Sequence, residues 1–142
     1  MLSKLLVPMD DSEMAERALV YALENHPEAD VTVLHVVGVP SMMMGDAVGI
    51  ALEDDIESAT NERAEPVFER ARSVATERDR EIETAVAVGH PARRIVERAE
   101  GYDTVLLGSH GRHRDGATRR YLIGNVADTV VRRSPVPVTV VR

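Results

Sequence analysis

Residues 105–133 read VLLGSHGRHRDGATRRYLIGNVADTVVRR, and this stretch decides the fold. A hydrophobic run ends at Gly108, a loop with further glycines at 111, 116 and 124 follows, and an amphipathic segment then begins. The pattern predicts a strand, a glycine-rich loop and a helix whose inward positions are Val126, Ala127, Val130 and Val131. Glycines allow close backbone approach, and the first N–H groups of a helix have no partner inside it. This unit therefore favours an anion, and phosphate is the candidate ligand.

Length and composition indicate one domain, residues 1–142. The chain is 44% hydrophobic and has no cysteine, which excludes disulfides and thiolate metal sites. It shows neither a secretory leader nor an apolar run long enough to span a bilayer, so we expect a cytoplasmic protein. A net charge of -7 argues against nucleic acid or a membrane surface as a partner.

The charge is unevenly spread. The loop after Gly108 concentrates arginines and contains one acidic residue: Arg112, Arg114, Arg119 and Arg120 stand against Asp115. Either these arginines form an ordinary solvated loop or they face a phosphate, and the sequence leaves both open.

Strand and helix patterns alternate along the whole chain. Apolar runs predict strands at residues 5–7, 31–37, 82–88, 104–107 and 136–141. Four helices are expected. The first begins after an N-cap at Ser12, and the second covers about residues 50–80, with a kink or break before Pro66. The third begins at Pro91, and the fourth begins after Gly124. The strictly alternating pattern of residues 82–88 suits an edge strand. This order predicts an α/β fold with a parallel sheet and right-handed crossovers.

Asp10 follows the first predicted strand directly. Ligand groups in open α/β sheets gather at the carboxyl ends of the strands, so Asp10 is a candidate binding residue. The alternative is a turn aspartate that hydrogen-bonds nearby backbone.

Five segments together resemble the universal stress protein family: VPMDDSEMAERAL (7–19), VTVLHVV (31–37), VGHPARRIVERA (88–99), LLGSHGR (106–112) and YLIGNVADTVVRRSPVPVTVVR (121–142). The resemblance spans nearly the whole chain in the same order. It implies a single-domain, open parallel sheet of five strands in the order 3-2-1-4-5, with helices on both faces, of the Rossmann-like adenine nucleotide alpha hydrolase type. Many members of this family bind ATP and form dimers, whereas others bind no nucleotide.

The family's ATP pattern, G-x2-G-x9-G-[ST], is matched only in part. Gly108 and Gly111 fit, but twelve residues separate Gly111 from Gly124, and Asn125 replaces the final hydroxyl residue. The backbone N–H groups of Asn125 and Val126 are unaffected by that replacement, and an asparagine amide can also donate.

The resemblance carries a binding site over to this chain. Asp10 matches an aspartate that approaches the adenosine, and Val36 matches a residue against the adenine. Val36 and Leu107 would be buried in this fold with or without a ligand. The predicted nucleotide-binding residues are Pro8, Met9, Asp10, Val36, Leu107, Gly108, Gly111, Arg112, Gly124, Asn125 and Val126.

Two functions therefore stay open. The first is a stress-response or signalling module that binds ATP, with Mg²⁺ as a candidate companion; the second is a nucleotide-free, dimeric interaction protein. A metal site at His110, His113 and Asp115 is disfavoured, because two histidines in a glycine loop lack fixed geometry. No catalytic residue is predicted, and ATP hydrolysis would at most be slow, because the chain has no P-loop and Lys4 is its only lysine.

The fifth strand, which begins at Val136 and ends at Val141, is the predicted homodimer interface. The strand order places it at a sheet edge, where unpaired backbone groups can accept another strand. Pro135 and Pro137 restrict the register, and the rival interpretation is that they prevent edge pairing altogether.

Overall fold

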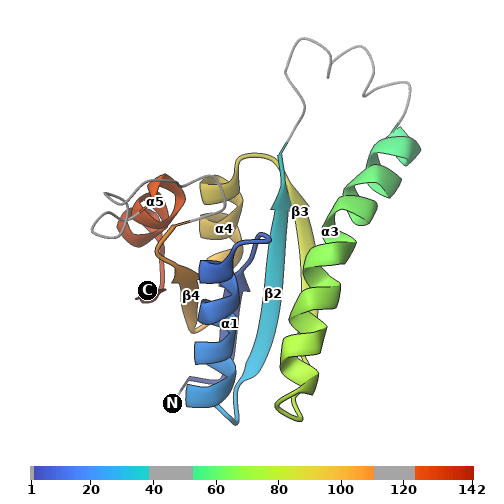
Figure 1. Cartoon of the computed structure of the whole chain (residues 1–142). Helices are drawn as coiled ribbons and strands as arrows, with labels where there is room; N and C mark the ends of the chain where they lie inside the picture. Colours follow the sequence, from blue (N-terminus) through green and yellow to red (C-terminus); the bar gives the residue numbers. More distant parts are fainter. Residues whose placement is uncertain (1, 39–52, 111–123) are drawn as a thin grey trace.

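A computed structural model describes residues 2–38, 53–110 and 124–142. In chain order the elements are β1 (Lys4–Pro8), α1 (Glu13–Asn25), β2 (Asp30–Val37), α3 (Glu53–Thr76), β3 (Glu83–Val88), α4 (Pro91–Ala99), β4 (Thr104–Gly108), α5 (Asn125–Arg133) and β5 (Val138–Val141). Figure 1 shows the strands standing side by side between helices. Gly111 and the arginines of the loop that follows it lie outside the described residues.

The sheet confirms the predicted fold class. Its five strands are parallel and ordered β3-β2-β1-β4-β5. β1 pairs with β2 from Lys4 opposite Asp30 to Pro8 opposite Leu34. The predicted edge position of β3 is confirmed, and β5 occupies the other edge.

Two helical layers cover the sheet. Leu5 and Val7 of β1 point into a core shared with α1 and α3, whereas Leu6 points into a second core shared with α4 and α5. The two sets alternate because successive strand residues face opposite sides of a sheet. Both faces are apolar, which explains why the strands read as continuous hydrophobic runs.

The start of α1 agrees with the prediction. Ser12 has extended backbone angles, and its hydroxyl accepts a hydrogen bond from the Ala15 N–H at 3.1 Å. The bond satisfies one of the first-turn donors that a helix leaves unpaired.

Two local predictions need correction. A kink or break was expected before Pro66, and there is no break: α3 continues through Pro66, which is exposed, so the helix carbonyl that loses its hydrogen bond is not buried in the core. In α5, Ala127 and Val130 are buried, but Val126 is 38% exposed and Val131 is 46% exposed. The inward stripe of this nine-residue helix is therefore narrower than the apolar pattern suggested.

Gly108 lets α1 approach the end of β4. A Cβ atom built on Gly108 would lie 2.7 Å from the backbone carbon of Met14 and 2.8 Å from its carbonyl oxygen. Backbone atoms cannot move aside as a flexible side chain can. The absence of a side chain at this position is thus a packing requirement between α1 and β4.

We expect Gly108→Ala to lower the free energy of unfolding by about 1–3 kcal/mol, the usual cost of overpacking. Urea denaturation measures the change. Gly101→Ala is the matched control, because a Cβ there would meet its nearest atom at 3.9 Å and should change stability by less than about 0.5 kcal/mol. Equal stability of the two variants would contradict this role of Gly108.

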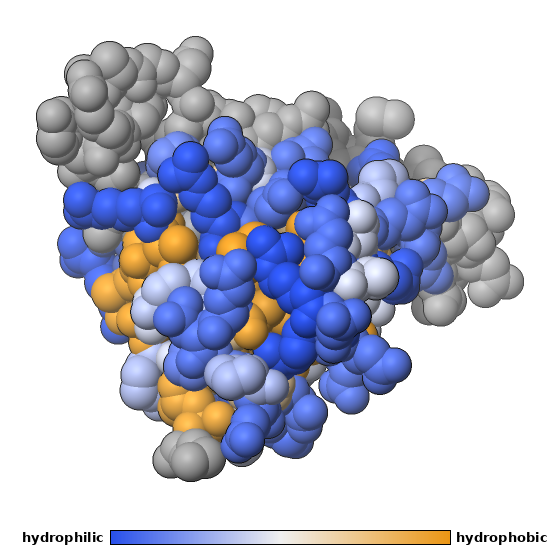
Figure 2. All heavy atoms as spheres, turned by 60° about the horizontal axis from the view of Figure 1, so that its bottom comes forward, coloured by the Kyte–Doolittle hydropathy of each residue, from blue (hydrophilic) through white to orange (hydrophobic). Residues whose placement is uncertain are grey.

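Asp103 fastens the chain start to the start of β4. Its Oδ2 atom accepts hydrogen bonds from the Ser3 N–H at 2.9 Å, the Ser3 hydroxyl at 2.9 Å and the Lys4 N–H at 2.8 Å. Figure 2 looks toward this end of the molecule, where hydrophilic side chains cover most of the visible surface and hydrophobic ones show in smaller areas. Polar contacts thus hold the start of β1.

The same hydrogen bonds lower the pKa of Asp103 below its usual value near 3.8, the backbone N–H of Ser3 contributing most and that of Lys4 next. A carboxylate with a lowered folded-state pKa stabilises the fold above its unfolded-state pKa, and loses that contribution as the pH falls through its folded-state pKa. Asp103→Ala should therefore lower the unfolding midpoint at about pH 6, and the difference from wild type should shrink toward about pH 3.

Thermal unfolding followed by circular dichroism measures both midpoints. Glu62→Ala, which removes an exposed carboxylate from α3, is the charge-matched control. A deficit in Asp103→Ala that stays constant with pH would show that the carboxylate's ionisation is not responsible.

Candidate functional site

A cavity of about 400 Å³ opens at the carboxyl ends of the central strands. Its walls come from the ends of β1, β2 and β4 and from the first turns of α1, α4 and α5. The lining residues are Pro8, Met9, Asp10, Ser12, Ala15, Leu34, His35, Val36, Pro91, Ile95, Leu107, Gly108, His110, Gly124, Asn125, Val126 and Ala127. From β1 the chain continues to β2 and β3 on one side of the sheet and then returns to β4 and β5 on the other side. Open α/β sheets bind their ligands at the point where the strand order reverses in this way.

The structure brings the predicted site residues together. All nine that lie in the described part of the chain line this one cavity: Pro8, Met9, Asp10, Val36, Leu107, Gly108, Gly124, Asn125 and Val126. Gly111 and Arg112 lie outside the described residues. That these nine contact a nucleotide stays a prediction.

Sequence reasoning missed the part of the wall that α4 provides. Pro91 was predicted only as a helix start, yet Pro91 and Ile95 both line the cavity. Leu34 could have been found from the sequence, because it lies two residues before Val36 and shares its face of the strand. The α4 residues could not have been found from the sequence, because their position depends on how this crossover helix packs on the sheet.

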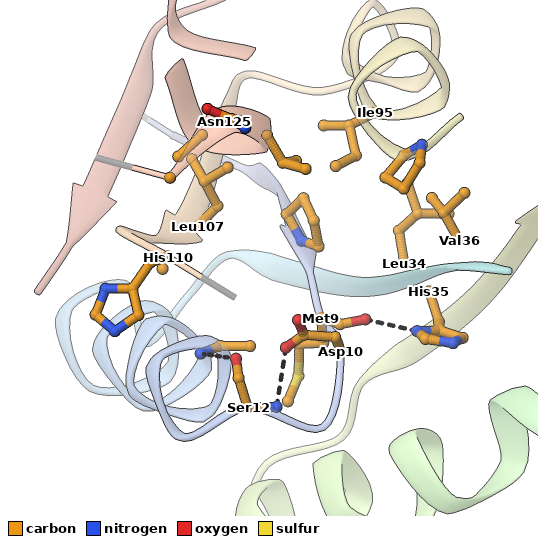
Figure 3. A pocket seen from close by; sticks show the side chains of 17 residues that line it. Met9, Asp10, Ser12, Leu34, His35, Val36, Ile95, Leu107, His110 and Asn125 are labelled. Atoms are coloured by element: carbon orange, nitrogen blue, oxygen red, sulfur yellow. Dashed lines mark hydrogen bonds between the residues drawn. The ribbon is translucent and has the colours of Figure 1, made fainter. Parts of the chain in front are cut away.

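The cavity has a mixed lining. Figure 3 shows Leu34, Val36, Ile95 and Leu107 gathered on one side, with Asp10, Ser12 and His110 across from them. Such a lining, mostly apolar with a few placed polar groups, is typical of small-molecule sites.

Asp10 has the turn role that the sequence left open. Its Oδ1 atom accepts a hydrogen bond from the Ser12 N–H at 2.9 Å, and Ser12 in turn caps α1 (Figure 3). The side chain is nevertheless only partly buried and lines the cavity.

His35 ties β2 to the end of β1. Its Nδ1 atom lies 2.7 Å from the Met9 carbonyl oxygen. A carbonyl can only accept, so Nδ1 carries the proton. The Met9 N–H donates to the Leu34 carbonyl at 2.8 Å, and the two bonds fix the segment that leaves β1.

The start of α5 faces the cavity. Gly124 is its N-cap, with no side chain to cap the helix, and the Gly124 N–H donates to the Ser109 carbonyl at 2.6 Å. The first intrahelical bond runs from the Asp128 N–H to the Gly124 carbonyl. By helix geometry, the N–H groups of the three preceding residues have no acceptor within α5, and all three residues line the cavity.

Gly108 and Gly124 also have a packing role that the sequence did not indicate. Met14 lies beside Gly108, and a Cβ on Gly124 would lie 3.1 Å from the His110 Cα. Both glycines therefore allow close packing of the protein's own backbone, and their predicted contact with a phosphate stays a prediction.

Other chemistries find little support in the described residues. They contain no group of three or more His, Cys, Asp or Glu side chains that could hold a metal ion, and His113 and Asp115 lie outside them. The Ser109 hydroxyl lies 3.2 Å from His110 Nδ1, but Ser109 is only 5% exposed. No helix in this part of the chain is both long and apolar enough to cross a membrane.

Both the sequence and the fold of the chain are similar to those of known proteins. The sequence model described as "Universal stress protein family" matches residues 1–142. The chain is 32% identical to Universal stress protein MJ0577 of Methanocaldococcus jannaschii, with 100% of this chain and 96% of that protein aligned. The solved structure of MJ0577 superposes with a TM-score of 0.77 at 30% identity, covering 99% of this chain and 96% of that one.

Two solved complexes share the fold at 22% identity. A universal stress protein from Archaeoglobus fulgidus in complex with dAMP gives a TM-score of 0.64 and covers 100% of this chain and 98% of that one. A universal stress protein in complex with cAMP gives a TM-score of 0.67 and covers 99% of this chain and 97% of that one. The whole-length family match and the relative at 32% identity establish that this chain belongs to the universal stress protein family.

Proposed function

We propose that this universal stress protein binds an adenine nucleotide, ATP, in the cavity at the carboxyl ends of β1, β2 and β4. The observation that carries the proposal is the order of groups around one opening: an apolar slot, a carboxylate and a helix N-terminus. These suit a base, a ribose and a phosphate chain in turn. The two related complexes with dAMP and cAMP support an adenine nucleotide as the ligand class.

The end of β2 offers backbone groups to the base. The Leu34 carbonyl accepts from Met9 on the β1 side, whereas the Val37 carbonyl accepts from Gly89 on the β3 side. Backbone groups alternate along a strand, so the N–H and C=O of Val36 face the β1 side, where β1 has already ended at Pro8. A neighbouring donor and acceptor match the adenine edge, which carries an amino group beside a ring nitrogen.

Asp10 and α5 would hold the rest of the molecule. Ribose hydroxyls are hydrogen-bond donors, and the Asp10 carboxylate, which lines the cavity, is an acceptor that suits them. The first N–H groups of α5 and the positive end of its dipole suit phosphate oxygens. Asp10 is the only carboxylate among the cavity residues of the described chain, so a Mg²⁺ ion would be held mainly by phosphate oxygens and water.

The proposal assigns binding, with a role in stress signalling, rather than turnover. Lys4, the only lysine of the chain, begins β1 and so lies at the opposite end of that strand from the cavity. A ligand that bridges β2, α1 and α5 would order the surface around the cavity and so alter what a partner meets.

Isothermal titration with ATP and Mg²⁺ should show binding to the purified chain, and GTP should bind more weakly because its base edge reverses the donor and acceptor. Asp10→Asn keeps an oxygen for the Ser12 turn but loses the charge, and should weaken ATP by about tenfold, or about 1.4 kcal/mol. Asp11→Asn, the same change one residue away and outside the cavity, is the control.

The nucleotide-free alternative makes the opposite forecast. If the folded protein gives no heat with ATP, AMP or cAMP and carries no adenine nucleotide after extraction, it is an interaction protein on the same scaffold. Asn125, which replaces the family's hydroxyl residue, and the lengthened glycine loop favour that alternative.

We also propose a homodimer through β5. The Pro137 carbonyl accepts from Val105 and the Val141 carbonyl from Ser109, so residues 137, 139 and 141 face β4. The missing N–H of Pro137 is therefore turned away from the open edge. Val138 and Val140 face outward, and within the described chain no hydrogen bond to their backbone groups is found. A two-fold axis would pair these strands antiparallel.

Val140→Pro should convert the dimer to a monomer, because it removes an outward N–H without breaking a bond to β4. Light scattering should give roughly half the wild-type mass. Thr139→Ala, in the same strand with its backbone facing β4, should leave the mass unchanged. A monomeric wild type, or a dimer that survives Val140→Pro, would refute this interface.

A further inference from the structure

The β3 edge of the sheet exposes a defined set of carbonyl groups. The Gly89 N–H donates to the Val37 carbonyl of β2, so residue 89 faces the sheet. Alternation along the strand then turns the backbone groups of Val86 and Val88 outward, away from β2. Outward N–H and C=O groups on an edge strand are a template for pairing with another chain.

Arg94 of α4 occupies one of these carbonyls. Its Nε atom donates to the Val88 carbonyl at 2.9 Å, and its Nη1 atom meets a Glu97 carboxylate oxygen at 2.7 Å. Gly89 makes the contact possible: a Cβ there would lie 2.8 Å from Arg94 Nε, and φ at this residue is 136°. The Arg94 guanidinium thus packs against the Gly89 backbone in the space that a side chain would otherwise fill.

Arg98, one helical turn later, reaches the next outward carbonyl. Its Nη2 atom lies 3.5 Å from the Val86 carbonyl oxygen. Four residues of helix advance about 6 Å. Two residues of strand advance about 6.6 Å. The spacing of the two arginines therefore matches the spacing of the outward carbonyls.

We propose that Arg94 and Arg98 form an edge guard that keeps a second copy of this chain from pairing with β3. An incoming strand would have to displace both guanidinium groups before its N–H groups could reach the Val86 and Val88 carbonyls. The β5 edge lacks such a cover on Val138 and Val140 within the described residues. With β3 guarded, association through sheet edges cannot continue from molecule to molecule into a growing chain. The edge guard depends on neither nucleotide nor the β5 interface.

The test removes the guanidinium groups and keeps the apolar stems. Arg94→Met/Arg98→Met should associate through β3, so light scattering at rising protein concentration should give a mass at least roughly double that of wild type. Arg93→Met/Arg17→Met makes the same change of charge at exposed positions that have no hydrogen bond to β3 in the described structure, and should keep the wild-type mass.

A third variant locates the new contact. Adding Val86→Pro to the double variant removes an outward N–H without a bond to β2, and should return the mass to that of wild type. Circular dichroism confirms that each variant is folded, and Arg94→Met alone serves if the double variant is not. An unchanged mass in the folded arginine variant, or growth that persists with Val86→Pro, would overturn the proposal. A monomeric wild type would refute only the β5 dimer.

Discussion

The early end of β1 is the constraint on which the cavity depends. β1 pairs with β2 only as far as Pro8 and then turns, with its exit fixed by the Met9 bonds to Leu34 and His35. β2 continues for three residues beyond Leu34, which is its last residue paired with β1. The gap is bounded by the start of α1 on one side and by β4 and α5 on the other. Without this difference in strand length, Val36 would be an ordinary ladder residue with no group to offer a ligand.

The second requirement is close packing at the ends of helices. α1 reaches β4 only because Gly108 has no side chain, and the loop at His110 reaches α5 only because Gly124 has none. These contacts bring two helix starts to the rim of the same opening. The arrangement places a capped helix start at Ser12 beside a helix start at Gly124 that has no side-chain cap. At the start of α1 one backbone N–H is already bound by the Ser12 side chain, whereas at the start of α5 no side chain occupies the first N–H groups.

Much of the fold could be predicted from the sequence because its signals are local. Apolar runs, the Ser12 cap and Pro91 at the first turn of α4 each mark an element by its own chemistry. The strand order came from the family resemblance and is confirmed. The continuity of α3 was not predicted, because water can hydrogen-bond to the carbonyl that Pro66 leaves unpaired. The exposure of Val131 was not predicted either, because the number of apolar residues that a short helix buries depends on what packs against it.

The candidate site was predictable along β1, β2 and β4 but not along α4. Asp10 could be placed at the site because it directly follows a predicted strand, whereas Val36 and Leu107 were placed there by the family resemblance. Pro91 and Ile95 reach the cavity through the packing of a crossover helix, which depends on side-chain volumes across the whole second core. The packing role of Gly108 was hidden for the same reason, because it depends on Met14, ninety-four positions earlier in the chain.

Ser109 uses both of its backbone groups to join two elements. Its N–H donates to the carbonyl of Val141 at the end of β5, and its carbonyl accepts from Gly124 at the start of α5. A molecule that repositions α5 and a molecule that grips β5 would thus act on opposite sides of one peptide unit. Thermodynamic reciprocity then applies: whatever factor the first binding event imposes on the affinity of the second, the second imposes on the first. Ser109 thus links the start of α5 to the end of β5 through two hydrogen bonds of its own backbone.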